Sequence, residues 1–305
     1  MIFIELEENQ KNEKVLVAVE PGSLILPPER LKANAAHRKV QKEAAEREMF
    51  REAQKKEARK MGPYYTVTFA RDETISLTDN ATLARFFYLV SYMGYDCKLM
   101  TTKRKSMTKA DAQRIMRLST ATFYRFWSEI EQKGLIEVQP NGEIVICSTM
   151  FHRGSAAVTG YSCGWMRIYQ RIRELYECMP ASQHRYIGAI LRMIPYINIE
   201  YNVLCYDPLE TDIHELEPMS MEAFCKEIGM TARNAEYYRD QYERITFYTE
   251  KGRASFCRSL FTSDGSEYIY INPEIMFAGR IGERVEHLAL YFRNQGKPNF
   301  LQEIS

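Results

Sequence analysis

Residues 108–147 read TKADAQRIMRLSTATFYRFWSEIEQKGLIEVQPNGEIVIC. Thr108 suits a helix N-cap, and the short helix KADAQRIM follows it. The turn Arg117-Leu118-Ser119 separates that helix from a second one, TATFYRFWSEIEQK, which Gly134 ends. LIEVQP, Asn141-Gly142 and EIVICS then read as a hairpin, because Asn-Gly is a strong turn signal. The stretch therefore predicts a helix, a tight turn, a helix and a hairpin in succession.

This order of elements is that of a winged helix-turn-helix, whose second helix enters the major groove of DNA. Upstream, PYYTVTFARDETISL reads as a hairpin, and ATLARFFYLVSYM reads as an amphipathic helix that Thr78 or Asp79 can cap. We therefore expect a first winged-helix domain over residues 63–160.

The same order returns 112 residues later. Thr108 corresponds to Ser220 and Ser119 to Thr231, so both second helices are expected to start on a hydroxyl cap. Gly229 stands at the turn that holds Arg117 in the first copy. The strand EIVIC (143–147) aligns with EYIYI (267–271), and a Met-Phe pair and a Gly follow each. We expect a second winged-helix domain with a C-terminal helix over 181–305, joined to the first by a connecting helix over 161–180.

Residues 1–62 read as N-terminal strands, MIFIEL and KVLVAV, followed by a charged helical arm. The arm holds 11 Lys or Arg against 6 Glu, and its large apolar residues are too few for a coiled-coil seam. A solvated helix is the favoured interpretation, and a basic arm along DNA phosphates is the alternative. The expected fold class is α+β, mostly helical, with two tandem winged helix-turn-helix domains after this N-terminal helix.

The run of hairpin, Leu-rich helix, helix-turn-helix and wing is followed by Ile271-Asn272-Pro273, Phe277 and Gly279. This pattern resembles the tandem winged-helix replication-initiator and regulator proteins of Gram-positive plasmids and phages. The resemblance covers residues 63–154 and, more faintly, 182–280. It implies sequence-specific binding of double-stranded DNA by a transcriptional regulator or repressor of a mobile element. The alternative is a replication initiator that binds origin repeats.

The first copy offers side chains for base contacts on its second helix. Leu118, Phe126 and Ile130 are expected to pack inward. Arg125 is the best candidate to read guanine, because its fork can bond two acceptors on that base. The residues expected to face the groove are Ser119, Thr120, Thr122, Tyr124, Arg125 and Ser128. For Ser119, helix capping is an equally good interpretation.

A basic cluster surrounds that helix. Residues 98–125 hold eight Lys or Arg and one acid, Asp111, a net of +7. Such a cluster is typical of a surface that neutralises phosphates, and a solvated face is the alternative. The residues expected to contact the DNA backbone are Lys103, Arg104, Lys105, Lys109 and Arg117.

The second copy differs in charge. Residues 207–244 hold ten acids and four bases, a net of −6. Its second helix still offers Arg233, Asn234 and Tyr237 for base contacts. The alternative is that this copy is a protein-interaction module, serving a homodimer or a protein partner.

No metal, cofactor or catalytic motif is found in the sequence. There is no H-E-x-x-H, P-loop, G-x-S-x-G or His-x-His string, and the seven cysteines lack zinc-ligand spacing. We therefore expect a protein that is not an enzyme. The first residues lack the basic head of a secretory signal, and no apolar stretch is long enough for a membrane span, so the expected location is the cytoplasm.

Overall fold

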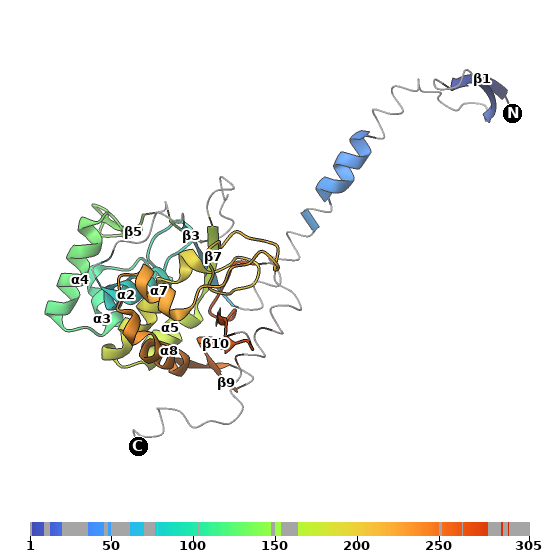
Figure 1. Cartoon of the computed structure of the whole chain (residues 1–305). Helices are drawn as coiled ribbons and strands as arrows, with labels where there is room; N and C mark the ends of the chain where they lie inside the picture. The colour runs from blue at the N-terminus through green and yellow to red at the C-terminus, as the bar shows by residue number, and fades with distance from the viewer. Residues whose placement is uncertain are drawn as a thin grey trace. The chain divides into compact units, whose positions relative to one another are not determined.

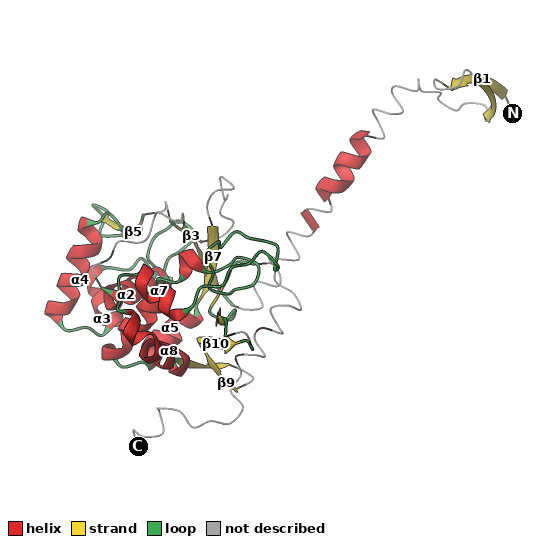
Figure 2. Ribbon diagram, in the orientation of Figure 1, coloured by secondary structure: helices red, strands yellow, loops and turns green. Residues whose placement is uncertain are grey.

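The computed structural model describes residues 2–8, 13–19, 36–45, 48–49, 62–69, 77, 79–102, 104–147, 150–153, 164–249, 252–263, 265–279, 288 and 292. The chain divides into two compact units, Met1–Lys55 and Lys56–Ser305. The described part is mixed α+β, with short helices and small antiparallel sheets, as expected for the fold class (Figures 1 and 2).

In the first unit, β1 (Ile2–Glu8) and β2 (Glu13–Val19) pair antiparallel, which confirms the two predicted N-terminal strands. Residues 36–45 and 48–49 are helical and exposed, in line with a solvated charged helix. The rest of the predicted arm lies outside the described residues.

The second unit is built around a four-stranded sheet in the order β12-β7-β3-β6. Its strands are β3 (Tyr64–Phe69), β6 (Phe151–His152), β7 (Gly164–Tyr169) and β12 (Met276–Phe277). At the centre of the sheet, Thr66 of β3 pairs with Arg167 of β7. On the outer side of each central strand, Thr66 pairs with His152 of β6, and Arg167 pairs with Phe277 of β12. Exchanging β3 with β7 therefore reproduces the register, so the sheet has two-fold symmetry about the Thr66–Arg167 pair.

Strand β7 corrects the connecting helix expected over residues 161–180. Of the described part of that range, residues 164–180, only α5 (Arg171–Cys178) is an α-helix. Met166 and Ile168 are buried, whereas Trp165 and Arg167, which alternate with them along the strand, are half-exposed. This alternation has the period of a strand with one buried face, which is why the segment joins the sheet.

The first half of the second unit continues with α2 (Asn80–Val90), α3 (Lys109–Met116), α4 (Thr120–Gln132), β4 (Ile136–Val138) and β5 (Ile144–Ile146). Asp79 caps α2 by accepting a hydrogen bond from the Thr82 amide at 2.7 Å, as predicted. Strands β4 and β5 pair antiparallel around Asn141-Gly142, which confirms the predicted hairpin. The second half of the hairpin predicted over 63–77 lies outside the described residues, apart from Leu77.

The second half holds α6 (His184–Leu191), α7 (Met221–Glu227) and α8 (Ala235–Arg244), with short 3-10 turns η1 (Ala181–Gln183), η2 (Ile194–Tyr196) and η3 (Ala232–Asn234). Its hairpins are β8 (Thr246–Thr249) with β9 (Gly252–Ser255), and β10 (Cys257–Phe261) with β11 (Glu267–Ile271). Helix α6 packs on α2 at Gly188, where a Cβ atom would lie 1.7 Å from the Asn80 carbonyl oxygen. Only glycine permits this approach, so the two halves share one core.

The same backbone hydrogen bonds recur in both halves. The Leu99 amide donates to the Ile144 carbonyl at 2.8 Å, and the Leu204 amide donates to the Ile269 carbonyl at 2.8 Å. Just before these residues, Cys97 and Asn202 are both left-handed, with φ of 61° and 56°. The two halves are therefore built on one repeated plan.

This register corrects the strand alignment made from the sequence by one residue. Ile144 is equivalent to Ile269, whereas the sequence alignment placed Tyr268 opposite it. Ile144 and Ile269 are both fully buried, and Tyr268 is half-exposed. Because side chains alternate between the faces of a strand, a one-residue shift would exchange the buried and exposed sets.

Candidate nucleic-acid interface

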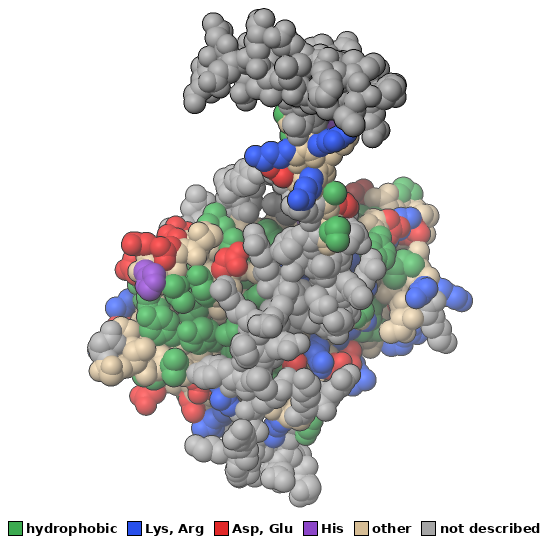
Figure 3. Space-filling model, turned by 90° about the vertical axis from the view of Figure 1, so that its right-hand side faces the viewer, with side chains coloured by type: hydrophobic (Ala, Val, Ile, Leu, Met, Phe, Trp, Pro, Cys, Tyr) green, Lys and Arg blue, Asp and Glu red, His purple; other side chains and the backbone are tan. Residues whose placement is uncertain are grey.

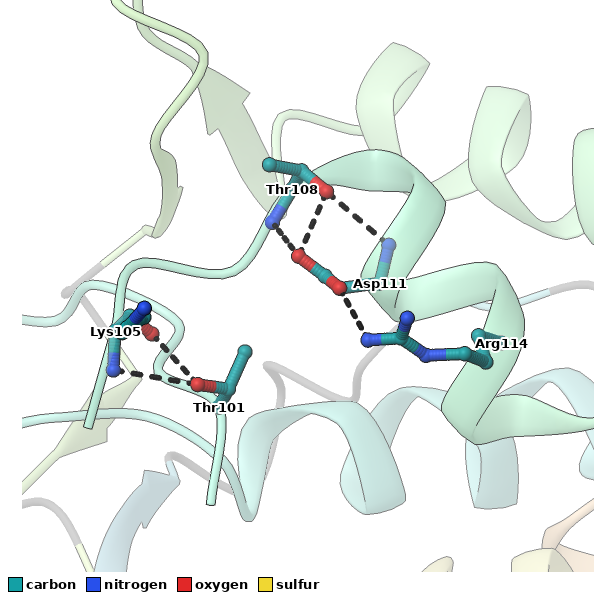
Figure 4. Close-up of polar contacts among 5 residues, drawn as sticks. All are labelled: Thr101, Lys105, Thr108, Asp111 and Arg114. Atoms are coloured by element: carbon teal, nitrogen blue, oxygen red, sulfur yellow. Dashed lines mark hydrogen bonds and ion pairs between the residues drawn. The ribbon is translucent and has the colours of Figure 1, made fainter. Parts of the chain in front are cut away.

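A capping box begins α3 (Figure 4). The Asp111 amide donates to the Thr108 hydroxyl at 3.2 Å, and the Thr108 amide donates to the Asp111 carboxylate at 3.1 Å. The Thr108 hydroxyl also donates to this carboxylate at 2.8 Å, and the hydrogen bonds from the Thr108 hydroxyl and amide lower the pKa of Asp111, which accepts from Arg114 as well. The arrangement confirms Thr108 as the predicted N-cap and stabilises the start of the helix.

A tight turn joins α3 to α4. Arg117 ends α3 in the left-handed conformation, with φ of 51°, and its side chain is exposed. Leu118 is half-buried against the core. Ser119 caps α4 by accepting from the Thr122 amide at 3.4 Å, and the two hydroxyls lie 2.8 Å apart. Ser119 and Thr122 therefore hold each other, which supports the capping interpretation of Ser119.

Helix α4 has one buried and one exposed face. The buried side chains are aromatic or aliphatic: Phe123, Phe126, Trp127 and Ile130. The exposed side chains include those expected to face the groove: Thr120, Tyr124, Arg125 and Ser128. The helix lies along an outer edge of the second unit (Figure 1), so a large partner has access to this face.

The side chains on the exposed face differ in how firmly they are held. Lys109 Nζ lies 5.1 Å from the ring centroids of both Tyr124 and Trp127, so its ammonium is placed over α4 by cation–π contact. Ser128 accepts from Gln132 at 3.0 Å. Arg125 is exposed and makes no hydrogen bond or ion pair with any described residue, so its guanidinium is available to a ligand.

The structure neutralises two members of the basic cluster. Lys98 Nζ lies 2.8 Å from Glu143 on the β4–β5 hairpin, and Arg114 pairs with Asp111. Hydrogen bonds from Lys98, Ser106 and Asn141 lower the pKa of Glu143 to about 2. Glu143 lies beyond α4 and well outside residues 98–125, so the charge of that segment alone did not indicate this pairing.

The bases left without a described carboxylate within 4.0 Å are Arg104, Lys105, Lys109, Arg117 and Arg125. Lys105 closes a turn with Thr101, whose hydroxyl accepts from the Lys105 amide at 3.2 Å (Figure 4). Lys103 lies outside the described residues. The free bases thus come from the Thr101–Lys105 turn, α3, the α3–α4 turn and α4.

Charge elsewhere on the second unit is mixed. On the face drawn in Figure 3, acidic, basic and apolar side chains of the described residues lie interspersed, with acidic ones gathered beside an apolar area. The loop before α7 contributes acids, and Asp207, Asp212, Glu215 and Glu217 in it are exposed. The bases around α3 and α4 thus lie in a part of the chain with few acids, whereas the loop before α7 is acidic.

The second copy of the helix pair departs from the expectation at its second helix. Ser220 caps α7 as predicted, accepting from the Ala223 amide at 3.2 Å, and Gly229 is left-handed with φ of 72°. Thr231 makes no side-chain cap hydrogen bond, so the predicted hydroxyl cap is wrong. A 3-10 turn, η3, precedes α8 and contains Arg233 and Asn234. At this helix start, backbone hydrogen bonds between residues three apart take the place of a side-chain cap.

The three side chains expected to read bases in this copy are all exposed, but they lie in different surroundings. Arg233 and Asn234 lie in η3 and only Tyr237 in α8. The Tyr237 hydroxyl is hydrogen-bonded to that of Tyr186 on α6, at 2.5 Å. Tyr237 is therefore fixed to α6, whereas Arg233 and Asn234 project from the turn.

Most bases of the second copy are paired. Lys226 lies 2.9 Å from Glu222, Arg239 2.5 Å from Glu267, and Arg244 2.7 Å from Asp240. Within residues 207–244, which the structure describes throughout, Arg233 is the one base with no ion pair. Residues 207–244 therefore offer one base without an ion pair, whereas residues 98–125 offer five among those described.

The described residues give no sign of a metal site or a membrane span. The described residues hold no group of three His, Cys, Asp or Glu placed to bind a metal ion. None of the described helices has the length and apolar character needed to cross a membrane. Sequence reasoning missed Arg153 and Arg173, two isolated bases that only the fold brings into one cleft.

No protein-family model matches this chain, and no similar curated protein or solved structure was found.

Proposed function

We propose that this chain is a sequence-specific double-stranded DNA-binding protein, a regulator or repressor of a mobile element, that acts by binding and not by catalysis. Each half of the second unit would be a winged helix-turn-helix, with α4 and the η3–α8 segment as the two recognition elements. The observation that carries the proposal is α4, whose exposed face combines Arg125 without a partner with Thr120 and Ser128. Arg and hydroxyl side chains on a projecting helix are suited to base edges and phosphates.

The difference in charge between the two halves supports different roles for them in DNA binding. Five free bases around α3 and α4 would anchor the chain on phosphates, and Arg233 with Asn234 would add base contacts once it is anchored. Loss of Arg233 is then expected to weaken binding by the full chain to a specific site. If the second half instead binds another protein or a second copy of the chain, Arg233→Ala should leave the affinity for DNA unchanged.

The test is selection of binding sites from a random duplex pool by the full-length chain, followed by anisotropy titrations. We expect enrichment of one motif bound at least roughly 10³-fold more tightly than random duplex at physiological salt. The full chain is used because β3 of the first half pairs with β7 of the second. If no motif is enriched and random duplex binds equally well, the proposal is wrong.

Replication initiation is the second candidate function. The two-fold register of the β3–β7 sheet suits inverted half-sites on one duplex, which an origin and an operator can both contain. Iterated sites that drive replication of a plasmid only when the protein is supplied would indicate an initiator. A site that overlaps a promoter and represses it would indicate a regulator.

A further inference from the structure

The second unit contains an open cleft with a volume of about 740 Å³ that lies apart from the exposed face of α4. It is bounded by the segment from Tyr92 to Arg104, by Arg153 after β6, and by Gln170 and Arg173 at the start of α5. Volumes of this size are typical of sites for small molecules. Three of its lining residues are arginines: Arg104, Arg153 and Arg173.

Two of these arginines are fixed and partly buried. Arg173 Nε donates to the Ser91 hydroxyl at 2.8 Å and its Nη2 donates to the Ser91 carbonyl, while its guanidinium stacks 3.7 Å from the Tyr92 ring centroid. Arg153 Nη1 donates to the Met93 carbonyl. Both guanidinium groups are therefore held in place before any ligand arrives.

Neither arginine forms an ion pair with a described residue. No described carboxylate lies within 4.0 Å of Arg153 or Arg173, and Asp96, which also lines the cleft, lies 3.9 Å from Lys98 Nζ. Burial lowers the pKa of Arg173 and the charge of Arg153 lowers it too, whereas Tyr92 and Glu177 raise it. Two like charges in one cleft, neither in direct contact with a carboxylate, favour an anion within it.

The donors that remain match a phosphate. Arg173 Nη1 and the Nε and Nη2 groups of Arg153 have no hydrogen-bond partner among the described residues. Planar guanidinium groups bind phosphate oxygens in pairs of parallel hydrogen bonds. At the same cleft, the Tyr95 ring is 81% exposed beside Arg153, 5.7 Å from its guanidinium carbon, and offers a flat surface for stacking.

We propose that this cleft binds a phosphorylated small molecule of nucleotide size, with its phosphate on Arg153 and Arg173 and its planar ring on Tyr95. The half-buried position of both arginines favours a soluble ligand over the backbone of duplex DNA, which is contacted from projecting side chains such as Arg125. The proposal does not depend on base reading by α4, because no residue of α4 lines the cleft; among the described residues, Arg104 is the one shared by the cleft and the bases expected to contact DNA.

The test is isothermal titration of the full-length chain with inorganic pyrophosphate and with ADP. We expect saturable binding at one site, weakened about tenfold or more by Arg153→Gln or Arg173→Gln, because each removes charged hydrogen bonds. Arg171→Gln is the matched control, since Arg171 lies on the same helix, donates to the Tyr248 carbonyl at 3.1 Å and does not line the cleft. Tyr95→Ala should weaken ADP binding and leave pyrophosphate binding unchanged.

Two further measurements keep the test decisive. Arg104→Gln removes an exposed cleft arginine whose side chain makes no described hydrogen bond or ion pair, so weaker binding by this variant supports the site even where Arg153→Gln fails to fold. Absence of saturable binding by both probes, or equal weakening by Arg171→Gln, would overturn the proposal. The proposal is also overturned if neither probe binds and Arg153→Gln weakens only the binding of duplex DNA, because the cleft would then contact backbone phosphates.

Discussion

Arg117 and Gly229 occupy equivalent turns between consecutive helices, and both are left-handed, with φ of 51° and 72°. Glycine adopts this conformation without steric cost, whereas an L side chain costs roughly 1–2 kcal/mol there. The first copy therefore retains an unfavourable arginine at a turn where the second has the residue that the backbone prefers. A phosphate contact by Arg117 would explain why a base is found there.

The first prediction follows from that comparison. We expect Arg117→Gly to stabilise the protein by about 0.5–1 kcal/mol, raising the midpoint of thermal unfolding by about 1–4 °C, while weakening DNA binding. Gly229→Ala should destabilise it by about 1 kcal/mol from backbone strain alone, because its Cβ would meet nothing within 4 Å. Calorimetry of both variants checks this, and a lower midpoint for Arg117→Gly would contradict it.

Arg125→Ala should weaken binding to the selected site by about 1–3 kcal/mol and binding to random duplex by much less, because a base-reading arginine acts only on the correct base. Arg114→Ala is the control, since it removes the same charge from the neighbouring helix, where Asp111 already pairs with it. Anisotropy titrations on both duplexes give the two affinities. Equal losses on specific and random DNA would mean that Arg125 touches only phosphate.

Replacement of Lys103, Arg104 and Lys105 by Ala should flatten the salt dependence of DNA binding. Each lost phosphate contact lowers the slope of log K against log salt by about 0.9. Lys98→Ala should change the slope less, because Glu143 already neutralises Lys98 at 2.8 Å. Titrations at several salt concentrations measure both slopes. An unchanged slope for the triple variant would show that the turn points away from DNA.

The hydrogen bonds that lower the pKa of Glu143 to about 2 also predict a pH dependence of stability. The folded state binds the proton more weakly than the unfolded state, whose glutamate has a pKa of about 4.3, so the contribution is present above about pH 4.3. It is lost as pH falls from there through about 2. Glu143→Gln should therefore be less stable than the native chain at pH 7, with a difference that shrinks toward pH 2. Denaturant unfolding at both pH values tests this, and a difference independent of pH would refute it.

Much of the first half could be predicted from local sequence. Thr108, Ser119 and Asn141-Gly142 act within a few residues of their own position, through caps and a hairpin turn, so they have the structures that the sequence predicts. The apolar face of α4 is likewise set by its spacing, with Phe126 and Ile130 buried as expected. Such features need no knowledge of distant contacts.

The remainder depends on contacts between segments far apart in the chain. The sequence predicts a helix where β7 lies, because the strand's partners, β3 and β12, are about a hundred residues away on either side. The pairing of Lys98 with Glu143 and the meeting of Arg153 with Arg173 likewise follow from how the sheets and helices pack. Net charge per segment is readable in sequence, but which charges remain unpaired is set by tertiary packing, because an ion pair forms only between side chains that the fold brings within a few ångströms.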